Sequence, residues 1–218
     1  MPAVVVFDCF DTVVLSGPLP GPERFAACLA DVLALDARRA GEVVHTVFTA
    51  VLTAMADPYA LQPATLGLLE EALRDGGERR SRADLEEALW QALGCADHDR
   101  YVLCEPVADA MRRVAAAGHT VRLLSNCYLP GTLMRRLLRR LAVPEVYDRA
   151  LFTADGGPKK PDPRAFRLIG DGPFERRVMV GDSWELDIGP ARALGWDTVR
   201  VDPAAPDPAE LAALWAPR

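Results

Sequence analysis

The chain has 218 residues, half of which are apolar, and a formal net charge of −6 at neutral pH. A chain of this length and composition can bury the core of one large domain, or of a domain with an insertion. Because the acidic balance comes without a basic tail, we expect neither a nucleic-acid partner nor an anionic membrane partner.

The first predicted element is a strand at residues 3–7, followed by a long helical block. Residues 3–7 form a continuous, largely β-branched run, which is typical of a strand buried on both faces of a parallel sheet. The segment "LSGPLPGP" at 15–22 is rich in helix and strand breakers and predicts a linker. From residue 22 to about 93, apolar residues recur at steps of three and four, which predicts four helices.

After about residue 101, predicted helices and strands alternate. Helices are expected at 106–117, at 130–141, from 162 onwards and at 186–194, and strands at 120–125, 149–154, 177–180 and 197–201. This alternation predicts an α/β fold, because parallel strands are joined by right-handed helical crossovers. The Ala/Pro-rich end of the chain predicts a turn and a short final helix.

Polar residues follow the predicted strands, at the edge of the sheet where ligands bind in such folds. They are Asp8 after the first strand, Ser125 and Asn126 at the end of the second, Lys160 after the third, and Asp182 and Asp187 after the fourth. We therefore expect these side chains to gather at one edge of the sheet.

Carboxylates that face a lysine and a hydroxyl suit a hard cation together with an anion. Mg²⁺ prefers oxygen ligands and commonly bridges carboxylates to a phosphate. Lys160 and Ser125 would hold phosphoryl oxygens, while Asp8 would attack phosphorus as a carboxylate nucleophile. The metal and the lysine would offset charge on the transferring group.

Several sequence features indicate the cytoplasm. Met1 is followed by Pro2 rather than by a basic segment and an apolar run, so no signal peptide is expected. No apolar stretch approaches the ~20 residues that span a bilayer. The five cysteines are odd in number and show no CxxC spacing, which indicates reduced thiols rather than a disulfide framework or a zinc site.

Four segments, "FDCFDTV", "LLSN", "KKPDP" and "GDSWELD", resemble in this order the four motifs of the haloacid dehalogenase superfamily. The helical block between the first two is similar to that superfamily's C1 cap. The resemblance implies a Rossmann-like core of residues 1–16 and 103–218, with an inserted all-helical cap at 17–102. It also implies an aspartyl-enzyme intermediate and, usually, a Mg²⁺-dependent phosphatase.

The resemblance also implies a role for each motif residue by its position. The implied catalytic residues are Asp8 as the nucleophile, Thr12 and Ser125 as nearby polar groups, and Lys160 as the anchoring lysine. The implied phosphate-binding residues are Ser125, Asn126 and Lys160. The implied metal ligands are Asp8, the backbone carbonyl of Phe10, Asp182 and Asp187.

One position departs from the phosphatase pattern. Phosphatases of this superfamily usually carry a second Asp, the general acid/base, where this chain has Phe10. General acid–base catalysis raises the reaction rate on the order of 10²–10⁴-fold, so its loss should lower the rate measurably. In an extended strand Asp8 and Phe10 share a face and Asp11 points away, so Asp11 replaces the missing group only if the loop turns there; water is the other candidate.

Three functions remain open on these motifs. The first is a Mg²⁺-dependent phosphatase acting on a small phosphorylated metabolite. The second is metal-independent C–X hydrolysis as in 2-haloacid dehalogenases, which also lack the second Asp, although "GDSWELD" resembles a metal-binding fourth motif. The third is a non-catalytic protein that binds a phosphorylated ligand. The sequence discloses neither the substrate nor the oligomeric state.

Overall fold

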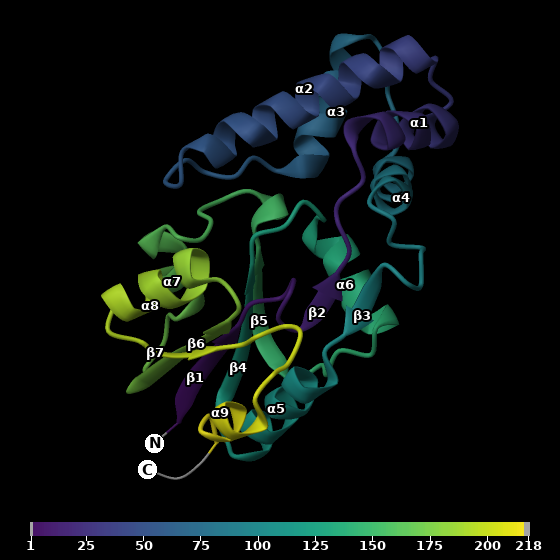
Figure 1. The fold of residues 1–218 in the computed structure, drawn as a ribbon. Helices are drawn as coiled ribbons and strands as arrows, with labels where there is room; N and C mark the ends of the chain where they lie inside the picture. The colour runs from purple at the N-terminus through teal and green to yellow at the C-terminus, as the bar shows by residue number, and fades with distance from the viewer. Residues whose placement is uncertain (1, 216–218) are drawn as a thin grey trace.

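A five-stranded parallel sheet forms the centre of the molecule, in the order β5-β4-β1-β6-β7 (Figure 1). The computed structural model describes residues 2–215. The strands are β1 (Ala3–Phe7), β4 (Thr120–Ser125), β5 (Tyr147–Phe152), β6 (Arg176–Gly181) and β7 (Asp197–Arg200). The predicted α/β fold with a parallel, Rossmann-like sheet is confirmed.

Helices cover both faces of the sheet, which explains the unbroken apolar run of β1. Val5 and Phe7 point into one large apolar cluster, whereas Val4 and Val6 point into a second cluster on the opposite face. The flanking helices are α5 (Glu105–Ala116), α6 (Gly131–Arg140) and α9 (Pro208–Ala212), which contribute to the first cluster, and α7 (Pro163–Ile169) and α8 (Gly189–Ala193), which contribute to the second. Among the residues described, no helix has both the length and the apolar character that a bilayer crossing requires.

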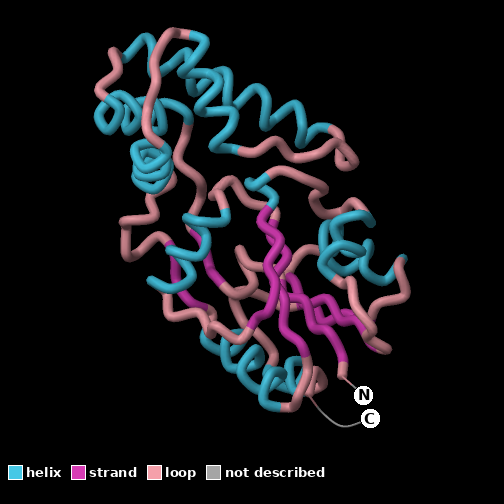
Figure 2. Tube along the Cα trace, turned by 180° about the vertical axis from the view of Figure 1, so that it is seen from behind, coloured by secondary structure: helices cyan, strands magenta, loops and turns pink. Residues whose placement is uncertain are grey.

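Four helices between β1 and β4 in the chain pack on one another and form what we call the helical insert, residues 22–92. They are α1 (Pro22–Leu33), α2 (Ala37–Ala56), α3 (Thr65–Asp75) and α4 (Arg82–Ala92). Figures 1 and 2 show the insert lying beyond one end of the sheet, and α3 contacts the short helix Thr153–Asp155 that follows β5. The insert therefore lies over the carboxyl ends of the strands.

Two short strands, β2 (Val14–Ser16) and β3 (Tyr101–Leu103), pair antiparallel at the two ends of the insert. The sequence prediction of a linker starting at residue 15 was wrong for residues 15 and 16. Those residues pair with a segment that is distant in the chain, and no local pattern of breakers or apolar residues reports such a pairing. This two-stranded β-ribbon of β2 and β3 joins the two ends of the insert to each other beside the sheet.

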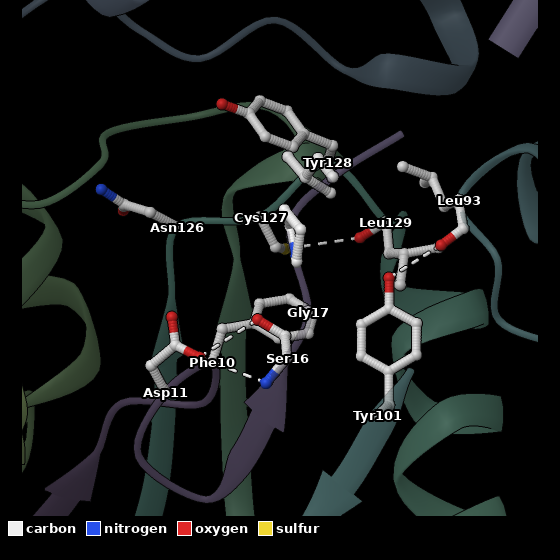
Figure 3. Close-up of a pocket in the computed structure, with 12 residues that line it drawn as sticks. Phe10, Asp11, Ser16, Gly17, Leu93, Tyr101, Asn126, Cys127, Tyr128 and Leu129 are labelled. Carbon is white, nitrogen blue, oxygen red and sulfur yellow. Dashed lines mark hydrogen bonds between the residues drawn. The ribbon is translucent and has the colours of Figure 1, made fainter. Parts of the chain in front are cut away.

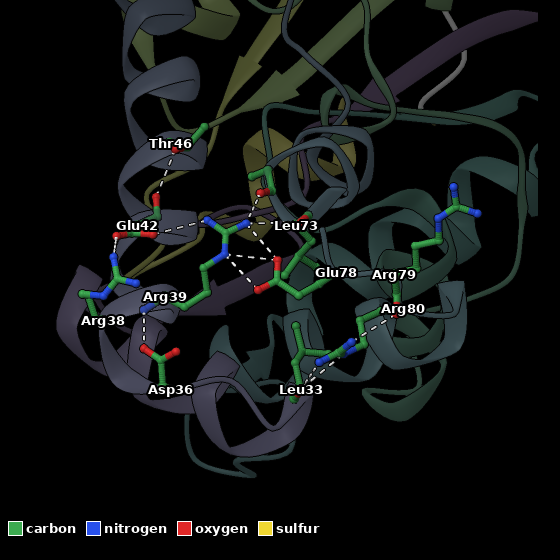
Figure 4. Close-up of polar contacts among 11 residues, drawn as sticks. Leu33, Asp36, Arg38, Arg39, Glu42, Thr46, Leu73, Glu78, Arg79 and Arg80 are labelled. Atoms are coloured by element: carbon green, nitrogen blue, oxygen red, sulfur yellow. Dashed lines mark hydrogen bonds and ion pairs between the residues drawn. The ribbon is translucent and has the colours of Figure 1, made fainter. Parts of the chain in front are cut away.

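A partly buried arginine links two helices of the insert (Figure 4). The Arg39 guanidinium, near the start of α2, donates to both carboxylate oxygens of Glu78 at 3.0–3.1 Å and to the carbonyls of Ala72 and Leu73 at the end of α3. This hydrogen bonding lowers the pKa of Glu78. A Cβ at Gly76 would lie 2.1 Å from the guanidinium, so a larger residue there would force the arginine side chain to shift. Polar contacts thus fix α2 against α3.

Candidate functional site

Three carboxylates meet where the central strands end. Asp8 follows β1, Asp182 follows β6, and Asp187 lies in the π-helical turn Trp184–Ile188. One carboxylate oxygen of each lies within 4.8 Å of the others. Asp8 is 7% exposed and Asp187 is fully buried, so this acidic cluster is largely removed from water.

Lys160 lies between two of these carboxylates. Its Nζ is 2.6 Å from Asp8 Oδ1 and 2.6 Å from Asp187 Oδ1, and the residue is 2% exposed. Asn126 holds the lysine by its backbone, because the Asn126 side chain donates to the Lys160 carbonyl at 2.8 Å and accepts from its N–H at 2.9 Å. Asn126, expected to bind phosphate, therefore uses its amide to position Lys160.

The cluster carries more negative than positive charge in a buried place. Burial raises the pKa of Asp8 to about 7, although Lys160 acts to lower it. Burial, and then repulsion from Asp187, also raise the pKa of Asp182. For Lys160 burial acts to lower the pKa, but attraction to Asp8 and Asp187 outweighs it and the pKa stands above its ordinary value. One ammonium does not balance three carboxylates, so the site favours a further cation.

Two hydroxyl groups border the acidic cluster. Thr12 is buried and its Oγ1 donates to Asp182 Oδ1 at 3.4 Å. The Ser125 hydroxyl at the end of β4 is fully buried and has no hydrogen-bond partner in the part of the chain that the structure describes. A buried hydroxyl without a partner costs on the order of 1–3 kcal/mol, so Ser125 is suited to hold a ligand oxygen.

The local sequence after β6 explains how Asp187 reaches the cluster. The π-helical turn brings the chain back on itself, so that the backbone N–H of Ser183 donates to Asp187 Oδ2 at 3.1 Å. A Cβ at Gly181 would lie 2.5 Å from the Asp187 carboxyl group. Glycine at this position is what allows the carboxylate to pack against the end of β6.

The loop after β1 turns sharply at Asp11, which has a positive φ of 57°. The Asp11 carboxylate accepts hydrogen bonds from the backbone N–H and the hydroxyl of Ser16, at 3.2 and 3.1 Å. The Phe10 ring packs beside Tyr101, with centroids 5.9 Å apart. Both Asp11 and Phe10 line a cavity of about 320 Å³, which we call the site cavity (Figure 3). The loop therefore turns at Asp11, and the Asp11 carboxylate is held by Ser16.

The lysine that precedes Lys160 contacts the helical insert instead. Lys159 Nζ donates to the carbonyls of Asp57 and Ala60, in the loop between α2 and α3, at 2.8 and 2.6 Å. Beside it, Gln62 and Gly157 exchange two backbone hydrogen bonds of 2.7 and 3.0 Å. These contacts join the loop before α7 to the helical insert. The sequence analysis missed them, because no sequence signal shows which core loop an inserted helical segment touches.

Comparisons with known proteins identify the family of this chain. The haloacid dehalogenase-like hydrolase family matches residues 2–195. The curated ribulose-1,5-bisphosphate 5-phosphatase of Halopiger xanaduensis is 29% identical over 120 residues, which is 54% of this chain and 49% of that protein. This chain therefore aligns with about half the length of that relative.

Solved structures of the same family share the fold. A 2-haloacid dehalogenase from Pseudomonas syringae aligns over 99% of this chain and 100% of its own, with a TM-score of 0.56 and 21% identity. A haloacid dehalogenase-like hydrolase from Xanthomonas campestris aligns over 98% and 90%, with a TM-score of 0.54 and 20% identity. With the family match over nearly the whole sequence, these findings show that the chain belongs to the haloacid dehalogenase-like hydrolases.

Proposed function

We propose that the protein is a Mg²⁺-dependent phosphatase of the cytoplasm that acts on a small phosphorylated molecule. The observation that carries the proposal is the buried acidic cluster bridged by Lys160, next to the partnerless hydroxyl of Ser125. The phosphatase named among the relatives supports the same reaction class. In this proposal residues 17–102, which contain the helical insert, act as a cap of the C1 type, and residues 1–16 and 103–218 form the catalytic domain.

The donor set fits Mg²⁺, which takes oxygen ligands and tolerates few other kinds. Asp8, Asp182 and Asp187 offer carboxylate oxygens within 4.8 Å of one another, and we assign the backbone carbonyl of Phe10 as a further ligand. When bound, the ion would neutralise charge on the transferring phosphoryl group. Thr12 holds the Asp182 carboxylate in place through its hydroxyl.

The chemistry proceeds in two steps on Asp8. Its carboxylate attacks phosphorus, the bond to the leaving-group oxygen breaks, and the phosphoryl group is attached to Asp8. Water then attacks phosphorus, which releases inorganic phosphate and restores the carboxylate. Lys160 and Ser125 hold phosphoryl oxygens, Asn126 fixes the Lys160 backbone, and the insert excludes bulk water.

The phenylalanine at position 10 leads to a specific prediction about the leaving group of the substrate. Without a carboxyl group at this position, the enzyme favours phosphates such as acyl phosphates, whose leaving groups depart without protonation. Replacing Phe10 by Asp is expected to raise kcat for alkyl phosphate esters about 10- to 100-fold, because a general acid is restored. Turnover of acetyl phosphate should change little.

Steady-state kinetics with both substrate types measures this difference, and the variant Phe10→Asn controls for loss of the ring. An unchanged rate on esters would mean that Asp11 or water already supplies the proton. Asp11→Asn separates these two, since it slows ester hydrolysis only if Asp11 is the donor.

A panel of phosphate compounds with Mg²⁺, and with EDTA in its place, tests the proposed function. Phosphate release is expected with Mg²⁺ and should fall to background with the chelator. The Phe10 position favours one alternative, a metal-independent dehalogenase. Halide release from 2-chloropropionate in the presence of EDTA would establish that alternative in place of the phosphatase. Binding of phosphate compounds without any release would identify the non-catalytic binding protein instead.

A further inference from the structure

A second cavity, of about 200 Å³, lies between the helices of the insert and the flanking residues Leu19, Pro20, Leu93 and Tyr128, and we call it the insert cavity. Nine of its eleven lining residues are aliphatic residues, prolines or phenylalanines, including Phe25 and Val47. Leu19, Leu93 and Tyr128 line both this cavity and the site cavity. The two cavities therefore adjoin each other, and Asn126, which holds the Lys160 backbone, also lines the site cavity.

One polar group in the insert cavity is unused. Thr65, the first residue of α3, is 4% exposed, and its hydroxyl has no hydrogen-bond partner within the described residues. Among the described residues that line this cavity, the other one with a polar side-chain atom is Tyr128, whose hydroxyl donates to Met55 Sδ at 2.9 Å. A buried hydroxyl left without a partner is costly, so Thr65 indicates a ligand atom that would complete its hydrogen bonding.

Neither cavity offers a place for a second anion. Among the described residues, no lysine or arginine lines either cavity, and Asp11 is the single charged residue on their walls. Arg100 lies behind the wall of the site cavity: its guanidinium donates to the carbonyls of Gly17 and Pro18, at 3.5 and 2.6 Å, and its Nε is buried without a partner among the described residues. A second phosphate would lose its hydration without gaining a cation.

The outer side of the insert cavity is open. Leu19 and Leu52 line it and are 54% and 58% exposed. Exposed leucines at the mouth of an apolar cavity lower the cost of a chain that extends beyond it, because its methylene groups still contact apolar surface.

We propose that the insert cavity binds the apolar body of the substrate, with one hydrogen-bonding group of that body meeting the Thr65 hydroxyl. The substrate class is then an amphiphilic monophosphate rather than a sugar bisphosphate. This inference rests on the proposed function for the position of the phosphate, at Ser125 and Lys160.

Calorimetric titration with alkylphosphonates tests the inference without any turnover. Phosphonates of one, four, six and eight carbons are titrated into the protein with Mg²⁺. The affinity is expected to rise by about fourfold per methylene until the cavity is filled, and by at least about tenfold between the four- and eight-carbon compounds. Phosphonoacetate, which carries a second anionic group, should bind no more tightly than methylphosphonate.

Two tryptophan variants locate the binding. Val51 lines the insert cavity, whereas Thr53, two residues along α2, is exposed and does not. Val51→Trp should remove the dependence on chain length while leaving methylphosphonate binding unchanged, which also shows that the variant is folded. Thr53→Trp should retain the full dependence. If Val51→Trp alters the oligomeric state but not the chain-length series, the apolar walls form a contact between copies and the inference is wrong.

Thr65→Val tests the hydrogen-bonding group separately. The change is nearly isosteric and removes a hydroxyl that has no partner in the protein, so the fold should tolerate it. A series of phosphonates that end in a hydroxyl is titrated at several chain lengths. At one of these lengths, the wild-type protein should bind several-fold more tightly than the variant. Octylphosphonate should bind both equally. A series without any such difference would contradict the role of Thr65.

The outcomes separate this inference from the proposed function. A clear chain-length series in a protein that releases no phosphate from any compound would retain the apolar subsite and remove the phosphatase. Phosphate release, combined with an affinity that does not rise with chain length, would retain the phosphatase and remove the apolar subsite.

Discussion

Replacing Asp8 by Asn is expected to lower phosphate release by at least about 10⁴-fold, because the amide provides neither the nucleophilic oxygen nor a charged metal ligand. The variant should remain folded. The carboxamide oxygen of the asparagine can still accept a hydrogen bond from Lys160. In the wild-type protein, burial raises the pKa of Asp8 to about 7. A neutral group at this position therefore costs the fold little, and at pH 8 the melting temperature should be equal or higher.

The measurement is phosphate release together with the mass of the quenched protein. Wild-type protein stopped during turnover should carry one added phosphoryl group, and the Asp8→Asn variant should carry none. Asp31→Asn, an equivalent change at an exposed aspartate of α1, serves as the control and should behave as wild type. Turnover of Asp8→Asn within tenfold of wild type would exclude Asp8 as the nucleophile.

Replacing Lys160 by Met is expected to reduce both activity and stability. The ammonium pairs with Asp8 and Asp187 at 2.6 Å in a site that is almost closed to water. Removing one partner of a buried ion pair typically costs about 3–5 kcal/mol of the free energy of unfolding, because the remaining charges are left without compensation. Turnover should fall by at least about 100-fold, since a donor to the phosphoryl oxygens is lost.

The stability loss should depend on pH, and its sign follows from the pKa of Asp8. That pKa is about 7 even with Lys160 present, against 3.8 as the ordinary value. Without the lysine it rises further, so the folded variant binds a proton that the unfolded chain has released. Stability of the variant therefore falls as the pH rises from about 4 through 7 and beyond, and the destabilisation is larger at pH 8 than at pH 5.

Urea unfolding of wild type and variant between pH 5 and pH 8 checks this prediction. Lys159→Met is a matched control, because it removes the neighbouring lysine but leaves the acidic cluster and its ammonium intact. Its stability should follow the wild-type dependence on pH. A pH-independent loss for Lys160→Met would show that the lysine contributes packing rather than charge compensation.

The sequence predicts the sheet and the strand-end residues well, because both depend on local patterns. A β-branched run such as residues 3–7 identifies a doubly buried strand, and parallel strands necessarily bring their carboxyl ends to one edge. The approach of Asp8, Asp182 and Asp187 to one another therefore follows from the order of elements alone. The same topology brings Lys160 to this edge, but its place between Asp8 and Asp187 was not predicted.

Other features depend on tertiary contacts and leave no sequence signal. The β2–β3 ribbon joins two segments that are distant in the chain, and the insert cavity forms only when Tyr128 meets the helices of the insert. Asp11 shows a different limit. Strand alternation places its side chain away from Asp8, but the alternation ends where the loop takes a positive φ, and side-chain periodicity carries no information about such a turn.

Lys159 and Lys160 are consecutive residues, although one holds the insert and the other the acidic cluster. A single peptide unit thus connects the lysine that contacts the helical insert with the lysine that pairs with Asp8 and Asp187. In the proposed function, opening of the insert would break the contacts of Lys159, whereas Asn126 would still hold the backbone of Lys160. Ligand entry would then loosen the insert while the ammonium of Lys160 stays between Asp8 and Asp187.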